Sequence, residues 1–297
     1  YDLYLYGDVF REIKNRDLIL IRGDIRDKKK LIGSSRGVDA IIHLACISND
    51  PSYDLNPNLG KSINYDAFFN VLEAAELNHV NRFIYASTSS VYGVKKEKNV
   101  REESTPMPLT DYSRYKLECE RILSLRDGEM EYTIVRPATV CGYAPRLRLD
   151  LSVNILTSHA LINKKIKIFG GKQLRPNINI KDMIDVYLML LDAPKDKIDK
   201  QTFNVGYQNL SIEEIARLVK ETIDDEEITL EYHNTDDNRS YHINSDKIKN
   251  GLGFVPRFSI EDAVESLVDA YKKGFIVNGL ENPLYHNIKL MKQINLQ

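Results

Sequence analysis

The segment RFIYASTSSVYG at residues 82–93 places a short apolar run, residues 83–86, directly before four hydroxyl-bearing side chains. An uninterrupted apolar run of this length is typical of a strand that is buried on both faces, as in a parallel sheet. In open parallel sheets, ligands bind outside the carboxyl ends of the strands. The segment therefore predicts a buried strand over 82–86 whose carboxyl end carries a row of groups able to hydrogen-bond a ligand.

Similar apolar or β-branched runs lie at 18–21, 38–44 and 132–137, and helix-length stretches lie at 65–78 and 112–126. Short buried strands that alternate with amphipathic helices predict an α/β fold, because parallel strands need helical crossovers. We therefore expect a doubly wound parallel (Rossmann) sheet that is covered by helices on both faces.

Beyond Gly142 the pattern becomes looser. Residues 165–171 are typical of a strand and turn, and residues 203–206 are typical of a short strand. Ser211 is a natural N-cap for a following helix. We expect this part of the chain to form a smaller, mixed α/β lobe.

The length of 297 residues exceeds the roughly 100–200 residues of a usual single core, so we expect two units. The first is predicted over 1–145, with 178–207 returning to it, and the second over 146–297. The 41 Lys and Arg residues against 43 Asp and Glu residues exclude a general basic surface for nucleic acid. Three cysteines cannot form a disulfide framework, and no apolar run is long enough to cross a bilayer. These features predict a cytoplasmic protein with neither a nucleic-acid nor a membrane partner.

Tyr112 and Lys116 are four residues apart in a predicted helix, so their side chains share one face. An ammonium beside a phenol favours the phenolate and lowers its pKa from near 10 toward the range in which it can act as a base. Thr88, in the hydroxyl row, can hold a substrate oxygen while Tyr112 exchanges its proton. Both features have plainer interpretations, because such Tyr–Lys pairs arise by chance in many helices and Ser/Thr runs close many strands.

Several further motifs follow one another along the chain. His43-Leu-Ala-Cys46 and Arg136-Pro-Ala-Thr-Val-Cys-Gly142 each involve a predicted strand, and Gln173-Leu-Arg175 precedes Asp182. In this order the motifs resemble the extended short-chain dehydrogenase/reductase family, the NAD-dependent nucleotide-sugar epimerases and dehydratases. The resemblance covers nearly the whole chain. It places the catalytic positions of the family on Thr88, Tyr112 and Lys116.

The resemblance implies an enzyme with NAD as its cofactor and a nucleotide sugar as its substrate. The residues implied for the cofactor are Asp2, Asp24, Ile25, Leu44, Ala45, Cys46, Asn64, Tyr112 and Lys116. The residues implied for the substrate are Thr88, Ser89, Thr139, Arg146, Arg175 and Arg239. Arg148 is a further candidate for the phosphates, although Arg146 and Arg148 could equally form surface salt bridges. The family also pairs its subunits through two long helices, which implies a homodimer through 65–78 and 112–126.

The chain departs from the family in lacking Gly-x-x-Gly-x-x-Gly after any strand, the turn that holds a dinucleotide pyrophosphate. Either the first βα unit lies upstream of Tyr1, or the chain is a relative that does not bind the cofactor. In the first case Asp2 would bind a ribose and favour NAD over NADP, because a carboxylate repels a 2′-phosphate. The plainer interpretation of Asp2 is a solvated terminal residue. Thr139 stands where the family has Asn, which weakens any substrate contact there.

Ser89 and Ser90 bear on the type of reaction. The 4,6-dehydratases of the family carry Asp-Glu directly after the catalytic Thr, an acid and a base that remove water from a ketone intermediate. Because serine hydroxyls do this poorly, the sequence favours an epimerase. A dehydratase, a reductase or a non-catalytic nucleotide-binding relative remain the alternatives. We expect no metal, since the histidines show no ligand spacing, and we expect His43 to be structural.

Overall fold

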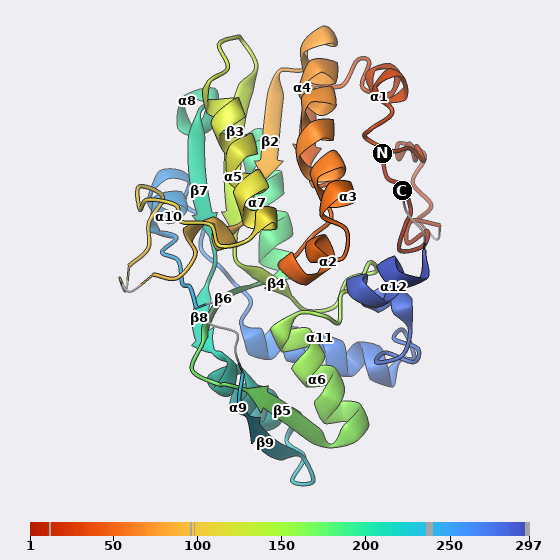
Figure 1. Cartoon of the computed structure of the whole chain (residues 1–297), viewed down its shortest axis with the longest axis vertical. Helices are drawn as coiled ribbons and strands as arrows, with labels where there is room; N and C mark the ends of the chain where they lie inside the picture. The colour runs from red at the N-terminus through yellow and green to blue at the C-terminus, as the bar shows by residue number, and fades with distance from the viewer. Residues whose placement is uncertain (12, 96, 98, 236–239, 295–297) are drawn as a thin grey trace.

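The computed structural model describes residues 1–294 except 12, 96, 98 and 236–239. Its central layer is a parallel sheet with the strand order β1-β2-β3-β7 (Figure 1). These strands are β1 (Ala40–His43), β2 (Arg82–Ala86), β3 (Glu131–Pro137) and β7 (Gln201–Val205). The strands predicted within 38–44, 82–86, 132–137 and 203–206 are confirmed.

Helices cover both faces of this sheet. Phe83 and Tyr85 of β2 pack in one core with α4 (Ala67–Leu77) and α5 (Asp111–Ser124). Ile84, between them, packs in a second core with α7 (Ile180–Asp192). Because successive side chains of a strand point to opposite faces, α7 lies across the sheet from α4 and α5. The doubly wound parallel arrangement is confirmed.

Shorter helices connect these elements. The π-helical turn η1 (Ser62–Asp66) precedes α4, so the helix predicted at 65–78 begins with an irregular turn. The 3₁₀ turn η2 (Ser89–Tyr92) follows β2. The remaining connecting elements are α1 (Lys28–Ser34), α2 (Asp50–Asp54), α3 (Pro57–Lys61), α8 (Lys195–Ile198), α10 (Asp246–Leu252), η3 (Pro283–Tyr285) and α12 (Asn287–Gln293).

A smaller mixed layer lies below the central sheet in Figure 1. It contains a sheet with the order β4-β6-β8 and a parallel pair, β5-β9. Its strands are β4 (Thr139–Cys141), β5 (Lys165–Phe169), β6 (Leu174–Asn179), β8 (Gln208–Ser211) and β9 (Thr229–His233). The helices α6 (Ser152–Asn163), α9 (Ile212–Ile223) and α11 (Ile260–Lys272) share one buried core with β5. Ser211 caps α9 in a capping box with Glu214, as its sequence predicts.

The strand predicted at 18–21 is wrong. Leu18, Ile19 and Leu20 are 39%, 78% and 43% exposed and form no ladder. The described part of this region contains one isolated bridge, between Asp2 and Arg22. A buried strand requires partners on its edges and layers over its faces, and the contacts in this region supply only that bridge. Among the described helices, none has both the length and the apolarity to cross a membrane.

One buried arginine joins four elements around the carboxyl end of β2. Arg136 of β3 forms a 2.6 Å ion pair with Glu120 of α5, and both side chains are less than a tenth exposed. Arg136 Nη1 also donates to the Tyr92 hydroxyl at 2.7 Å, and that hydroxyl donates to Asn204 of β7 at 2.8 Å. Glu120 in turn accepts a short hydrogen bond from Ser87, at the start of the hydroxyl row. The network therefore ties the loop after β2 to the helix α5.

We expect Glu120→Gln to destabilise the fold by about 3 kcal/mol or more, because it leaves the Arg136 guanidinium buried without its counter-charge. Denaturant unfolding followed by circular dichroism measures this loss. The control is Arg217→Gln, which removes an exposed ion pair with Glu213 and should leave the unfolding midpoint nearly unchanged. Equal effects of the two substitutions would contradict the role assigned to Glu120.

Candidate active site

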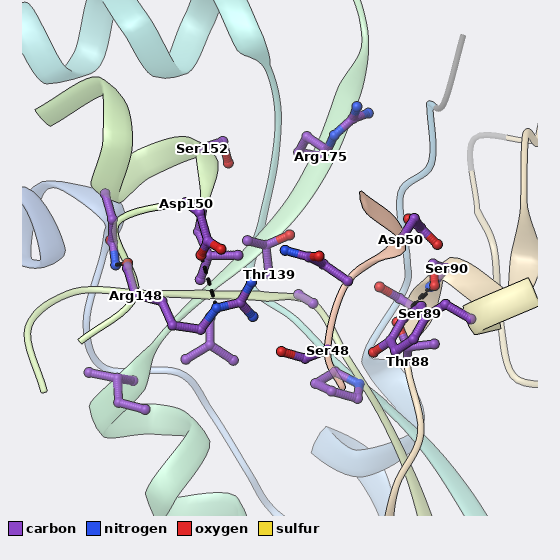
Figure 2. Close-up of a pocket in the computed structure, with 18 of the residues that line it drawn as sticks. Ser48, Asp50, Thr88, Ser89, Ser90, Thr139, Arg148, Asp150, Ser152 and Arg175 are labelled. Carbon is purple, nitrogen blue, oxygen red and sulfur yellow. Dashed lines mark hydrogen bonds and ion pairs between the residues drawn. The ribbon is translucent and has the colours of Figure 1, made fainter. Parts of the chain in front are cut away.

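A cavity of about 500 Å³ lies between the carboxyl ends of β2 and β3 and the segment that precedes α6. The strand ends contribute residues 87–90 and 137–140 to its lining. The segment 142–152 forms much of the opposite wall, and Tyr112 reaches the cavity from α5. Figure 2 shows polar side chains from these elements turned toward one another. The predicted hydroxyl row therefore opens onto this cavity.

The Thr88 side chain is held by the turn that follows β2. Its Oγ1 accepts a hydrogen bond from the Ser90 backbone N–H at 3.1 Å and lies 3.0 Å from Ser90 Oγ. Gly93 ends this turn with φ of 63°, and a Cβ at that position would lie 2.1 Å from the Met107 carbonyl oxygen. The turn therefore requires glycine at 93 and keeps the Thr88 hydroxyl at the cavity wall.

Tyr112 lies in the first turn of α5. Thr110 is the N-cap of this helix, and it forms a capping box with Ser113. The cap fixes the residue at which the helix begins. It therefore also fixes the position from which the Tyr112 side chain reaches the cavity. Lys116 follows one turn later and is 3% exposed.

The Tyr112 phenol is strongly perturbed. Burial raises its pKa well above the ordinary value near 10, and Cys46 and Asp50 raise it further. Arg148 and a hydrogen bond with Thr88 lower the pKa and oppose this effect. The phenol is therefore protonated at neutral pH in this state, and the Thr88 hydroxyl is near enough to act on its pKa. Burial is the largest cause of the shift in the Tyr112 pKa, followed by these neighbouring groups, whereas the sequence spacing predicts Lys116 as the main influence.

Lys116 instead directs its ammonium to the end of β2. Its Nζ donates to the Ala86 carbonyl oxygen at 2.7 Å and lies 5.0 Å from the centre of the Tyr85 ring. An ammonium carries three donors, so the same group can also reach a ligand at this strand end. The ring of His43 stacks on Tyr85 at 5.9 Å, and burial, with a smaller effect of Lys116, lowers its pKa to about 3. His43 is therefore a neutral packing residue.

The other residues implied for the cofactor lie at the end of β1 and in the N-terminal region. Leu44 is 54% exposed beyond β1, and Ala45 and Cys46 follow it. Asn64 is buried, and its amide both accepts from the Ile47 N–H at 2.8 Å and donates to the Ile47 carbonyl at 2.9 Å. Asn64 thus shapes the loop after Cys46 with its side chain.

Asp2 and Asp24 lie outside the cavity lining. The Asp24 carboxylate pairs with Arg26 Nη2 at 2.7 Å; although burial acts against ionisation, hydrogen bonds from Arg26 lower its pKa. Asp2 accepts a hydrogen bond from the Tyr4 backbone N–H at 2.5 Å. Ile25, next to Asp24, belongs to the buried core around α4.

The structure gathers most of the residues implied for the substrate in the cavity wall. These are Thr88, Ser89, Thr139, Arg146 and Arg175. Arg239 lies outside the described residues. Arg148 also lines the cavity. No group of three or more His, Cys, Asp or Glu side chains among the residues the structure describes could hold a metal ion.

Sequence reasoning missed several polar residues of the cavity wall, among them Ser48, Asp50, Asp150 and Tyr241. Asp50 follows Asn49, the N-cap of α2, and precedes Pro51, so the Asn-Asp-Pro pattern could have marked a helix start there. Nothing in the local sequence indicates that this helix faces Tyr112.

A model of the NAD dependent epimerase/dehydratase family matches residues 7–206. The chain is 26% identical to the UDP-glucose 4-epimerase of Lactobacillus helveticus, over 84% of this chain and 78% of the relative. It is 25% identical to the dTDP-D-glucose 4,6-dehydratase of Homo sapiens, over 86% of this chain and 75% of the relative. Among solved structures, the UDP-glucuronic acid 4-epimerase of Bacillus cereus, in complex with UDP-glucuronic acid and NAD, has a TM-score of 0.77 at 26% identity. That match covers 89% of this chain and 85% of the other.

Proposed function

Since the chain belongs to the NAD dependent epimerase/dehydratase family, we propose that it epimerises a nucleotide-activated sugar by transient oxidation to a ketone. The family consists of NAD-dependent enzymes that act on nucleotide sugars. One observation carries the finer proposal: Thr88, after the end of β2, and Tyr112, in the first turn of α5, both line a cavity large enough for a sugar.

In this proposal Tyr112 moves the proton of one sugar hydroxyl. The Thr88 hydroxyl holds the same sugar oxygen by a hydrogen bond while Tyr112 exchanges the proton. Bound NAD would supply reversible hydride chemistry at the sugar carbon, and inversion there would require the hydride to return to the opposite face of the ketone. In the return step the protonated Tyr112, favoured by burial, supplies the proton to the oxygen. Arg148 favours the opposite, ionised form, which the oxidation step requires.

The residues present fit one end of the cofactor. The buried Lys116 ammonium at the end of β2 has donors suited to the hydroxyls of the nicotinamide ribose. Leu44, Ala45 and Cys46 would border the cofactor on the loop that Asn64 shapes. Asp2, Asp24 and Ile25 are assigned to the adenosine end by resemblance alone. We propose that 1–145 with 178–207 form the cofactor unit and that 146–297 form the substrate lobe.

The cavity supports an epimerase over a dehydratase. Ser89 and Ser90 occupy the positions of the dehydratase acid and base, and Ser90 Oγ lies 3.0 Å from Thr88 Oγ1. The two carboxylates of the wall have other partners, since Asp50 accepts from Thr110 and Asp150 pairs with Arg148. The human relative that is 25% identical is a dehydratase, which keeps dehydration as the second candidate. A non-catalytic relative is disfavoured because Thr88, Tyr112 and Lys116 are all present.

A homodimer through α4 and α5 is also proposed. Phe69 is 43% exposed on α4, and its ring lies 5.5 Å from Tyr65, which lies 5.2 Å from Tyr115 of α5. These rings form an aromatic surface shared by the two helices. A second copy of the chain would cover it.

The three cysteines are free in the structure, with Cys119 and Cys141 buried. Free thiols persist in a reducing compartment. This supports the cytoplasmic location that we propose.

We expect Tyr112→Phe to lower turnover of a nucleotide sugar at least about a thousandfold, because general acid–base catalysis by one group contributes up to about 10⁴-fold. The ring still packs, so the unfolding midpoint and the affinity for the sugar nucleotide should change little. In the wild-type enzyme kcat/KM should rise with pH through the alkaline range, because the raised pKa keeps the base form scarce at neutral pH. A variant that retains turnover would remove Tyr112 from the mechanism.

The reaction type predicts the mass of the product. Incubation with NAD and UDP-glucose, UDP-glucuronic acid or dTDP-glucose should yield an isomer of unchanged mass and new retention time. Mass spectrometry after chromatography detects it. A product lighter by one water would establish the dehydratase instead.

We expect light scattering at micromolar concentration to give twice the mass of one chain. Phe69→Glu should yield a monomer, since it places a charge in the proposed interface. Leu188→Glu, on α7 across the sheet and 54% exposed, is the control for an added surface charge. A wild-type mass equal to one chain would exclude the dimer.

A further inference from the structure

Arg146 and Arg148 both line the cavity, but the protein engages them differently. Arg146 Nη1 donates to the Leu147 carbonyl at 3.1 Å, and its Nη2 donates to Asn287 Oδ1 at 2.8 Å. Its Cζ also lies 3.5 Å from the centre of the Tyr6 ring. Both terminal nitrogens and one face of this guanidinium therefore have partners within the protein.

Arg148 is held at one nitrogen only. Its Nε donates to Asp150 Oδ1 at 3.0 Å, whereas its Nη2 is buried and has no hydrogen-bond partner among the described residues. Figure 2 shows the Arg148 guanidinium turned into the cavity, with the dashed line to Asp150. Native proteins rarely leave a buried donor unpaired, so this nitrogen indicates a site where a ligand supplies the acceptor.

Asp150 is itself fixed from its other oxygen. Asp150 Oδ2 accepts from the Asn287 backbone N–H at 3.0 Å. Asn287 is fully buried, and its Nδ2 donates to Ser48 Oγ, after β1, at 3.1 Å. The direction of Arg148 is thus set by a chain of contacts that runs through Asp150 to Asn287.

The charge of the cavity suits an anion. Three arginines and two aspartates are the charged groups among the described lining residues, so positive charge is in excess. Arg148 is also near enough to Tyr112 for its charge to act on the phenol. An anionic group bound by Arg148 would therefore lie close to the proposed reacting end.

We propose that Arg148 is a specificity-determining residue whose guanidinium pairs with an oxyanion of the nucleotide sugar, while Arg146 belongs to the framework of the wall. The inference rests on the proposed function. The oxyanion is either a diphosphate oxygen or a carboxylate on the sugar, since the planar fork of a guanidinium matches both. Asp150 and Asn287 act as positioning residues.

Isothermal titration calorimetry with UDP, UDP-glucose, UDP-glucuronic acid and dTDP-glucose tests this proposal. Arg148→Met should weaken binding of the recognised ligands roughly tenfold or more, and Arg148→Lys should recover part of the loss because it keeps the charge without the fork. If the diphosphate is the partner, all ligands that the wild type binds weaken together. If a carboxylate is the partner, only UDP-glucuronic acid weakens.

Arg146→Met is the matched control, with the same loss of charge and size. It should lower the unfolding midpoint more than Arg148→Met does, and weaken ligand binding less. Should Arg148→Met fail to fold, Arg148→Lys carries the test. Unchanged affinities in folded Arg148 variants, with ligands that the wild type binds, would overturn this inference and leave the proposed function intact. A wild-type protein that binds none of the four ligands would overturn both.

Discussion

The ion pair between Arg136 and Glu120 is the constraint on which the rest of the site depends. A charge buried in the sheet needs its counter-charge at a fixed place, and Glu120 supplies it from the helix that also carries Tyr112. The same guanidinium holds the Tyr92 hydroxyl, which closes the turn bearing Thr88. The two side chains proposed to act on the sugar hydroxyl, Thr88 and Tyr112, are therefore placed by one electrostatic contact that neither of them makes.

Much of the fold follows from local patterns. The run at 82–86 and the cap at Ser211 depend on neighbouring residues, and both are where the sequence predicts them. The run at 18–21 is also apolar but forms no strand, because burial depends on partners that no local pattern reveals. Composition reports that a segment can be buried, and tertiary contacts decide whether it is.

The candidate site, like the fold, could be predicted only in part from local sequence patterns. Thr88 and Thr139 reach the cavity because they follow the ends of β2 and β3, and Tyr112 reaches it from the first turn of α5, positions that spacing can locate. The directions of Lys116 and Asn64 could not be predicted, since the first turns to the Ala86 carbonyl and the second to the Ile47 backbone. Asp150 could not be found either, because its importance comes from a loop contact with residue 287.

The contact between Ser48 and Asn287 spans 239 positions of the chain. Because a chain is synthesised from its N-terminus and domains begin to fold as they emerge, the parallel sheet can assemble long before residue 287 leaves the ribosome. The cavity wall is completed only when Asn287, at the start of α12, reaches Ser48. Loop closure over so many residues slows the formation of this contact. A nascent chain would therefore hold an ordered core before Asn287 supplies the contact through Asp150 that aligns Arg148.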